Sequence, residues 1–211
     1  LPDSGQVAVQ YVQESIARQN PNYYKANVLN SVLGGGYSSR LNQEVRIKRG
    51  LSYGAGSSFG MRRDAGIFRM STQTKNESAA EVAELFVEEL NKIAKGEVSE
   101  SELTPRKSVL TGDFGRDIAT TNGLAATIGS LAVYDLPLSD INSYIQKTNS
   151  VTGSDIKSFA QTNLNAVLGK IVIVGDASKF MDNLKKRFSR TPVRVIQADK
   201  LDLESGNLEK K

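Results

Sequence analysis

The sequence contains no histidine and no cysteine among its 211 residues. Catalytic zinc sites draw on His, Cys and carboxylates and are hardly ever built from carboxylates alone, so we expect no metal site and no bound cofactor in this chain. Missing histidine removes the usual base of Ser and Cys hydrolases, which leaves only rarer Lys-based or carboxylate-based schemes. Missing cysteine excludes thiol catalysis and a disulfide framework. We therefore predict that the chain alone is inactive as a hydrolase.

Long apolar runs are also missing. No run reaches the roughly 18 apolar residues that a membrane-spanning helix needs, so no membrane span is predicted. The first residues lack the charged-then-apolar layout of a signal peptide. The chain opens Leu1-Pro2-Asp3 without an initiator Met. We expect a fragment or a processed product whose targeting information is absent, so the residues predict no compartment.

Positive charge is modest and dispersed. The net charge is +4 and the pI near 9.2, with the densest basic stretch at Lys185, Lys186 and Arg187. Nucleic-acid binding would call for interleaved exposed aromatic residues or a recognisable module. We interpret the stretch as a solvated helix face and predict no nucleic-acid partner. A nucleic-acid-binding domain would instead show steeply salt-dependent binding.

Hydrophobic periodicity predicts a sequence of helices and strands. Strands are expected over residues 6–13, twice between 51 and 74 around a turn at 61–64, over 170–175 and over 193–197; helices are expected over 24–33, 39–49, 79–94, 100–114, 122–134, 139–147, 153–164 and 180–188. Strands separated by helical stretches indicate an α+β fold, a mixed or antiparallel sheet with helices packed on one face. We predict one domain over residues 1–200 and a polar, mobile tail over 201–211.

Finer local signals accompany these elements. The pairs Ser78/Glu81 and Ser99/Glu102 have the spacing of capping boxes, and Gly50 is expected to end the second helix in a left-handed conformation. The continuous apolar run within residues 170–175 predicts a strand buried on both faces.

Two motifs could be interpreted as functional sites, but we favour a structural interpretation of each. Residues 34–36 are three glycines, but no Gly-Lys-Ser/Thr follows and a helix precedes them, so a tight flexible link between helices is preferred to a phosphate loop. The carboxylates Glu100, Glu102, Asp113 and Asp117 could form a catalytic pair, yet they occupy polar positions of amphipathic helices. We interpret them as solvated helix faces.

One segment carries more specific information. Leu33-Gly-Gly-Gly-Tyr-Ser-Ser-Arg-Leu-Asn-Gln-Glu-Val-Arg-Ile-Lys-Arg-Gly-Leu-Ser-Tyr53 resembles the second-half motif of the pitrilysin family of inverted-motif zinc peptidases, which includes mitochondrial processing peptidase and insulin-degrading enzyme. In that family one domain holds zinc through His-x-x-Glu-His, and the other contributes an Arg and a Tyr seven residues apart. The matching residues here are Arg46 and Tyr53, and His-x-x-Glu-His is absent.

Elementary chemistry gives these two residues a role. Arg46 lies near a helix end and Tyr53 near the start of the next strand, so the chain reversal between them can bring both side chains to one edge. A phenol can donate to an oxyanion, and a guanidinium can hold carbonyls or carboxylates. Without the motif, Arg46 would be a helix-end surface cation and Tyr53 an ordinary strand aromatic.

The resemblance implies a function. We expect the non-zinc half of a zinc metallopeptidase, which supplies substrate-binding and oxyanion-stabilising groups to a partner domain or subunit that carries the zinc and His-x-x-Glu-His. A peptide is the implied substrate, and residues 34–36 are a candidate hinge for closure, to be tested by Gly35→Ala. The alternative is a catalytically silent scaffold subunit of the same fold. Export or a periplasmic location is an analogy with bacterial relatives.

Overall fold

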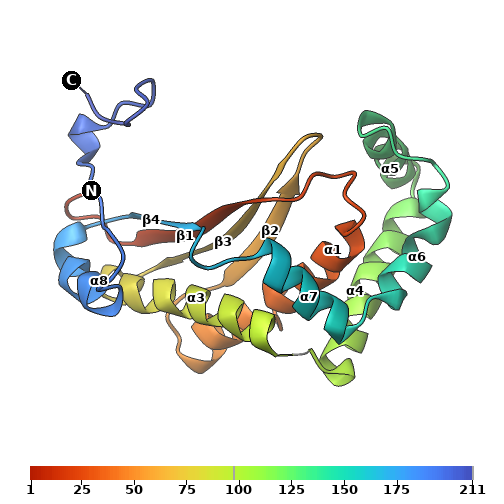
Figure 1. Ribbon diagram of the computed structural model, residues 1–211, viewed down its shortest axis with the longest axis horizontal. Helices are drawn as coiled ribbons and strands as arrows, with labels where there is room; N and C mark the ends of the chain where they lie inside the picture. The colour runs from red at the N-terminus through yellow and green to blue at the C-terminus, as the bar shows by residue number, and fades with distance from the viewer. Residues whose placement is uncertain (97, 211) are drawn as a thin grey trace.

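A four-stranded antiparallel sheet with helices against one face organises the chain, and the computed structural model describes residues 1–96 and 98–210 (Figure 1). The strand order is β2-β3-β1-β4. The strands are β1 (Val7–Ser15), β2 (Ala55–Met61), β3 (Gly66–Thr74) and β4 (Lys170–Val174). This arrangement confirms the predicted α+β class.

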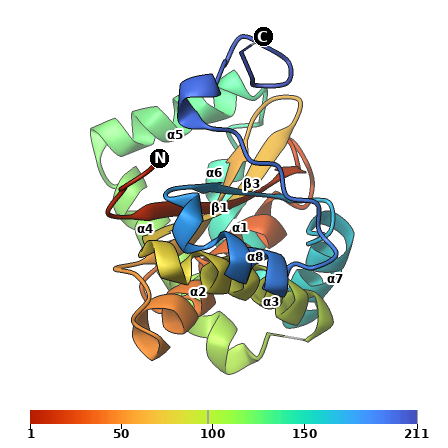
Figure 2. The same cartoon turned by 90° about the vertical axis from the view of Figure 1, so that its left-hand side faces the viewer.

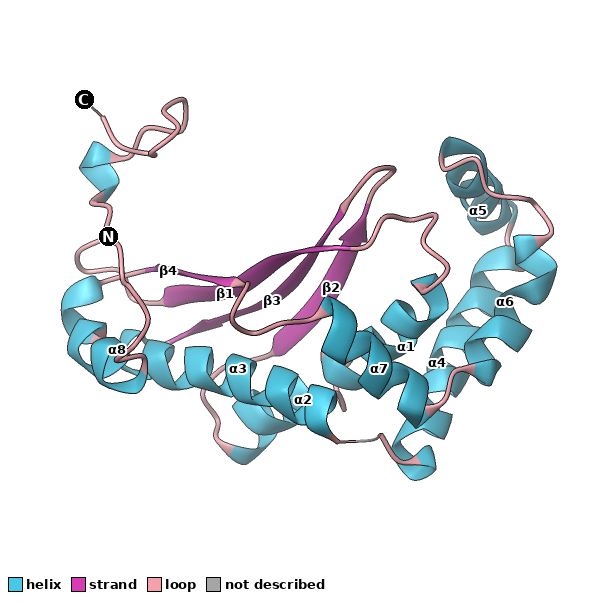
Figure 3. Cartoon of the chain, in the orientation of Figure 1, coloured by secondary structure: helices cyan, strands magenta, loops and turns pink. Residues whose placement is uncertain are grey.

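Helices make up most of the rest of the described chain (Figure 3). They are α1 (Tyr23–Leu33), α2 (Arg40–Asn42), the π-helix η1 (Gln43–Lys48), the 3-10 helix η2 (Asn76–Ser78), α3 (Ala79–Lys95), α4 (Glu100–Ile118), α5 (Thr121–Val133), α6 (Asp140–Ser150), α7 (Gly153–Asn163), the 3-10 helix η3 (Ala177–Lys179), α8 (Met181–Arg187) and the 3-10 helix η4 (Ala198–Lys200). The predicted helices are present, with ends shifted by a few residues.

The core lies between one face of the sheet and the helices below it. Alternate residues of β1 and β3 point inward, among them Tyr11 and Phe68, whose rings meet edge to face at 6.3 Å. The apolar stripe of α3 packs against this face and buries Phe86 completely. Burial raises the pKa of Tyr11 to about 12, and its hydroxyl donates to the carbonyl of Asn165 at 3.0 Å.

Among the described residues, no helix covers the other face of the sheet. Figures 1 and 2 show α3 and α8 beneath the sheet, whereas α5 and the chain after α8 stand beyond its upper side. Exposed and half-exposed positions alternate with the buried ones along β1 and β3, as expected for an antiparallel sheet with one solvated face. Within the described residues, no helix is both long enough and apolar enough to cross a membrane.

Two strand predictions were wrong. Residues 193–197 form no strand and pair with no part of the sheet. The apolar run of β4 is not buried on both faces: β4 is an edge strand, and Val172 and Val174 are 47% and 50% exposed. A run of valine and isoleucine favours a strand, but its neighbours decide how much of it is buried.

Both predicted capping boxes were also wrong. Ser78 ends the 3-10 turn η2, and neither Ser78 nor Ser99 forms a side-chain cap hydrogen bond. A capping box forms instead at α7, between Thr152 and Asp155. By contrast, Gly50 has the expected left-handed conformation, with φ of 62°.

The end of the chain is only partly organised. Leu201 and Glu209 form an isolated β-bridge across the last described residues. The domain boundary at residue 200 and the mobility of the tail stay predictions, and residue 211 lies outside the described chain.

Candidate functional site

The segment that resembles the peptidase motif begins where α1 packs against β2. Gly34 donates its N–H to the Asn30 carbonyl at 2.9 Å, and its own carbonyl accepts from Ser57 N at 3.1 Å. A Cβ on Gly34 would lie 2.2 Å from Ser57 N, and one on Gly35 would lie 2.9 Å from Ser31 Cα, whereas one on Gly36 would meet nothing within 4 Å. The first two glycines are therefore packed closely, and open space surrounds only the third.

Arg46 lies in η1, the π-helical continuation of α2. Helix η1 ends at Lys48, and the N–H of Gly50, two residues further on, donates to the Arg46 carbonyl at 3.0 Å. The Arg46 guanidinium carbon lies 5.0 Å from the centre of the Tyr37 ring, within the range of a cation–π contact. Among the residues that the structure describes, Arg46 forms no ion pair.

Neighbouring cations of η1 are engaged differently. Lys48 and Arg49 each lie 2.5 Å from a carboxylate oxygen of Glu44, and Arg49 also reaches Glu81 at 3.7 Å. The Lys48 ammonium, and to a lesser degree the Arg49 guanidinium, lowers the pKa of the Glu44 carboxyl. Both carboxylate oxygens of Glu44 are thus engaged by Lys48 and Arg49, whereas the Arg46 guanidinium contacts the Tyr37 ring.

Tyr53 combines an exposed side chain with a restrained backbone. Its side chain is 89% exposed, the largest exposure among the exposed large hydrophobic side chains of the described chain. On either side of it, Thr74 Oγ1 donates to the Leu51 carbonyl at 2.5 Å and Thr72 Oγ1 donates to the Gly54 carbonyl at 2.7 Å. The loop is thus tied to β3 while the phenol projects into solvent.

The two predicted site residues lie on one continuous segment, but among the described residues no hydrogen bond or cation–π contact joins them. Arg46 makes its contact with Tyr37, and no hydrogen bond of the Tyr53 hydroxyl is found among the described residues. Sequence reasoning missed Tyr37, which is 63% exposed, as a neighbour of Arg46. No periodic signal identifies that contact, because it depends on the course of the glycine segment.

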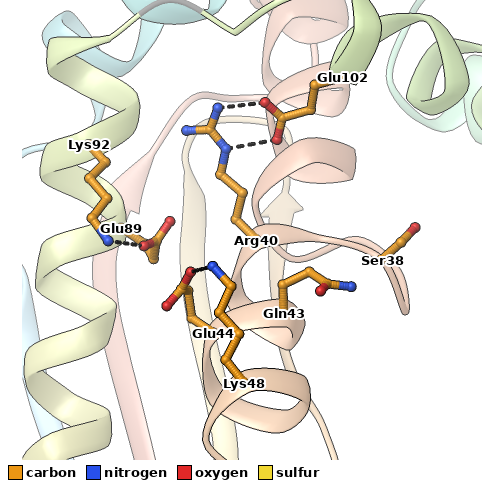
Figure 4. Close-up of a pocket in the computed structure, with 8 residues that line it drawn as sticks. All are labelled: Ser38, Arg40, Gln43, Glu44, Lys48, Glu89, Lys92 and Glu102. Atoms are coloured by element: carbon orange, nitrogen blue, oxygen red, sulfur yellow. Dashed lines mark hydrogen bonds and ion pairs between the residues drawn. The ribbon is translucent and has the colours of Figure 1, made fainter.

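A hollow of about 340 Å³ lies beside this segment, between α2, η1, α3 and the start of α4 (Figure 4). Its lining residues are Ser38, Arg40, Gln43, Glu44, Lys48, Glu89, Lys92 and Glu102. The charges are paired across it, with Arg40 bound to Glu102 through two hydrogen bonds of 2.7 and 2.8 Å and Lys92 bound to Glu89 at 2.6 Å. Neither predicted site residue lines the hollow, and of its ion pairs Arg40–Glu102 joins α2 to α4, whereas Lys92–Glu89 lies within α3.

The carboxylates interpreted as solvated helix faces fall into two groups. Glu102 is not merely solvated, because its hydrogen bonds raise the pKa of Arg40 and link α4 to α2. Asp113 is exposed and pairs with Arg116 on the same helix. No group of three or more Asp and Glu side chains in the described chain is placed to hold a metal ion.

Comparisons with known proteins identify the family of this chain. The family model for the peptidase M16 inactive domain matches residues 1–110. An uncharacterized zinc protease of Streptomyces coelicolor is 29% identical over 146 residues, which cover 69% of this chain and 32% of the relative. The chain therefore spans about a third of the length of that relative.

Solved structures show the same fold. A peptidase M16 inactive domain from Pseudomonas fluorescens has a TM-score of 0.75 and 29% identity, over 81% of this chain and 41% of that one. A chain of complex III₂ from Candida albicans has a TM-score of 0.72 at 14% identity, over 88% of this chain and 46% of that one. The match over the first 110 residues, which include the whole Arg46–Tyr53 segment, decides the assignment: this chain belongs to the peptidase M16 inactive-domain family of zinc proteases.

Proposed function

We propose that this domain supplies Arg46 and Tyr53 to peptide hydrolysis by a separate zinc-bearing domain or subunit. The partner domain would provide the zinc and its ligands, and this chain would bind the peptide and support the transition state. Two observations on the described residues support this proposal. The exposed Tyr53 hydroxyl forms no hydrogen bond, while the backbone on either side of it is hydrogen-bonded to β3. The Arg46 guanidinium, seven residues earlier, contacts the Tyr37 ring and pairs with no carboxylate.

The chemistry assigns different roles to the two side chains. When water attacks a peptide carbonyl, negative charge develops on its oxygen, and the Tyr53 hydroxyl can donate to that oxyanion. The planar Arg46 guanidinium can hold peptide carbonyls or a carboxylate already present in the bound substrate. Tyr53 should therefore act mainly on kcat and Arg46 mainly on KM.

A π-helical turn supports this interpretation. Short π-helical insertions occur frequently at functional sites because they change the direction in which nearby side chains project. Here η1 carries Arg46, and its charged neighbours are tied to α3 through Glu44, Arg49 and Glu81.

The test is peptidase activity of this domain alone, of the zinc-bearing half alone, and of the two together as one polypeptide or a mixture. We expect activity only in the combination. Tyr53→Phe should lower kcat by about 10²–10³-fold, the usual loss on removing one oxyanion donor. Arg46→Ala should raise KM, because it removes a contact made to the bound peptide.

Matched controls separate these effects from general damage. Tyr134→Phe removes a hydroxyl that donates to the Met61 carbonyl at 3.3 Å, and Arg116→Ala removes an exposed arginine in the last turn of α4. Both control variants should retain wild-type kinetics. If Arg46→Ala and Tyr53→Phe matched their controls, the catalytic proposal would be refuted.

A scaffold role is the second candidate, and the fold likeness to a chain of complex III₂ favours it. A scaffold would need neither an unengaged phenol nor a free guanidinium. It predicts a stable complex between this domain and its partner whose formation, measured by analytical ultracentrifugation, is unchanged by both substitutions while peptidase activity is absent.

A further inference from the structure

A single buried amide connects the chain segments around the proposed site. Asn42, the last residue of α2, is 4% exposed. Its Nδ2 donates to the Tyr37 carbonyl at 2.5 Å, and its Oδ1 accepts from Ala55 N at 3.3 Å. Neither partner is on the helix of Asn42, so the side chain bridges separate parts of the chain.

The bridged positions flank the site residues. Tyr37 contacts Arg46 through its ring, and η1, which carries Arg46, begins directly after Asn42. Ala55 begins β2 two residues after Tyr53, and a Cβ on the intervening Gly54 would lie 3.6 Å from Asn42 Oδ1. The Asn42 amide therefore lies where the backbones that carry Tyr37, Arg46 and Tyr53 come together.

Only an amide satisfies both contacts. The Tyr37 carbonyl requires a donor and the Ala55 N–H requires an acceptor, and Asn offers one of each on a short side chain. Aspartate would keep the acceptor but set a carboxylate oxygen against the Tyr37 carbonyl. Alanine would leave both backbone groups without this partner in a buried place, where unsatisfied polar groups are costly.

We propose that Asn42 is a positioning residue that fixes the positions of Arg46 and Tyr53 relative to each other. No hydrogen bond or cation–π contact joins the two site residues among the described residues, so their separation depends on the backbone segments that Asn42 connects. This inference rests on the proposed function. It predicts that Asn42 affects catalysis without contacting substrate, because misplacing a reacting group by about 1 Å can cost about 10²-fold in rate.

A matched control lies just after the end of β3, on the β1–β4 side of the sheet. Asn76 is 3% exposed, donates through Nδ2 to the Ser4 carbonyl at 2.7 Å and accepts from Asp176 N at 2.9 Å. It is therefore a buried amide with the same pair of backbone partners, but it joins segments that carry neither Arg46 nor Tyr53. Asn76→Ala reports what the loss of such a bridge does to folding alone.

The experiment measures kcat and KM of this domain combined with its zinc-bearing half, for the variants Asn42→Ala, Asn42→Asp and Asn76→Ala. The thermal unfolding of each variant is measured in parallel. Kinetics are compared at a temperature where each protein is folded. We expect Asn42→Ala and Asn42→Asp to lower kcat/KM by about 10- to 100-fold, whereas Asn76→Ala should lower the unfolding temperature with unchanged kcat/KM. Equal kinetics for the Asn42 and Asn76 variants would overturn the inference.

Double variants distinguish this inference from the proposed function. If Asn42 acts through the site, Tyr53→Phe should cost less in the Asn42→Asp background than in the wild type, because the phenol is already misplaced. Full additivity would overturn the positioning role. If Tyr53→Phe and Arg46→Ala had no effect in the wild type, the proposed function itself would fail, independently of Asn42.

Discussion

Asp155 makes two kinds of contact at the start of α7. Its carboxylate accepts from Thr152 N at 3.0 Å, and Thr152 Oγ1 accepts from Asp155 N at 3.1 Å, which completes a capping box. Lys25 of α1 lies 2.9 Å from the same carboxylate. The Lys25 hydrogen bond, followed by those from Thr152, lowers the pKa of Asp155 to about 2. One side chain thus caps α7 and joins it to α1.

Asp155→Asn should lower the free energy of unfolding at neutral pH by about 1 kcal/mol, because it removes a carboxylate charge that Lys25 and the N-terminus of α7 stabilise. An unfolded aspartate has a pKa of about 3.9, so the stabilisation is complete above that pH and is lost as the pH falls toward the folded pKa. Urea unfolding of both proteins between pH 7 and pH 3 measures this difference. The gap between the wild type and the variant should narrow below about pH 4.

Asp113→Asn is the control for this prediction. Asp113 also pairs with a cation, Arg116, but both side chains are more than half exposed. Exposed pairs contribute little, so the variant should be close to the wild type at every pH. An Asp155→Asn protein that behaved like Asp113→Asn would contradict the assigned role of the capping box.

At the scale of elements, the contact between the end of α1 and β2 determines where the site segment begins. Gly34 lies against the backbone of β2, and Ser57 Oγ donates to Asn30 Oδ1 at 2.7 Å. Two adjacent elements are therefore joined by a backbone hydrogen bond, a side-chain hydrogen bond and a close approach that only glycine permits. The glycines do form the predicted tight link between helices α1 and α2, Gly34 and Gly35 are closely packed, and the flexibility of the link stays a prediction.

Gly34→Ala should destabilise the domain by about 1–3 kcal/mol, because its Cβ would overlap the backbone of Ser57. Gly36→Ala should have a much smaller effect, since a Cβ there meets nothing within 4 Å. Thermal and urea unfolding of the two variants tests the difference. Equal stability of Gly34→Ala and Gly36→Ala would show that the α1–β2 contact is not as close as described.

The hinge hypothesis changes for the same reason. Gly35→Ala would place a Cβ 2.9 Å from Ser31 Cα and disturb packing whether or not the segment moves. Gly36→Ala is the better variant, because it reduces backbone freedom without a steric conflict. A fall in kcat with unchanged stability would support a hinge at this position, and unchanged kcat would argue against one.

The whole molecule has one face of its sheet covered by helices and the other free of them (Figure 1). Its core is formed without any metal-binding cluster among the described residues. Because the sequence offers neither imidazole nor thiolate ligands, folding cannot depend on a zinc site of the usual kind.

Chelation should therefore leave the unfolding temperature of this domain unchanged. The measurement is differential scanning calorimetry of the purified domain with and without EDTA, and with added Zn²⁺. A zinc-bearing partner half should lose peptidase activity under the same treatment and serves as the positive control. A marked shift of this domain's unfolding temperature would reveal a metal site that the sequence and structure do not predict.

Local pattern accounted for most of the helices and for the strands of the sheet. The apolar stripe of α3 and the left-handed Gly50 are decided by neighbours in sequence, which is why they could be predicted. The Arg46–Tyr53 spacing likewise belongs to the sequence alone, and with it the resemblance that the family match confirmed. The catalytic role of those two residues stays a prediction.

Tertiary contacts decided the rest. The exposure of β4, the absence of a strand at 193–197 and the ion pair that joins Glu102 to Arg40 each depend on which distant segment lies alongside. The same is true of Asn42, whose importance appears only when Tyr37 and Ala55 meet its amide. The sequence by itself determined most of the secondary structure, the family and the candidate residues, because these follow from short-range periodicity and spacing. Only the folded chain determined burial, edges and the placement of the site, because those arise from contacts between residues far apart in sequence.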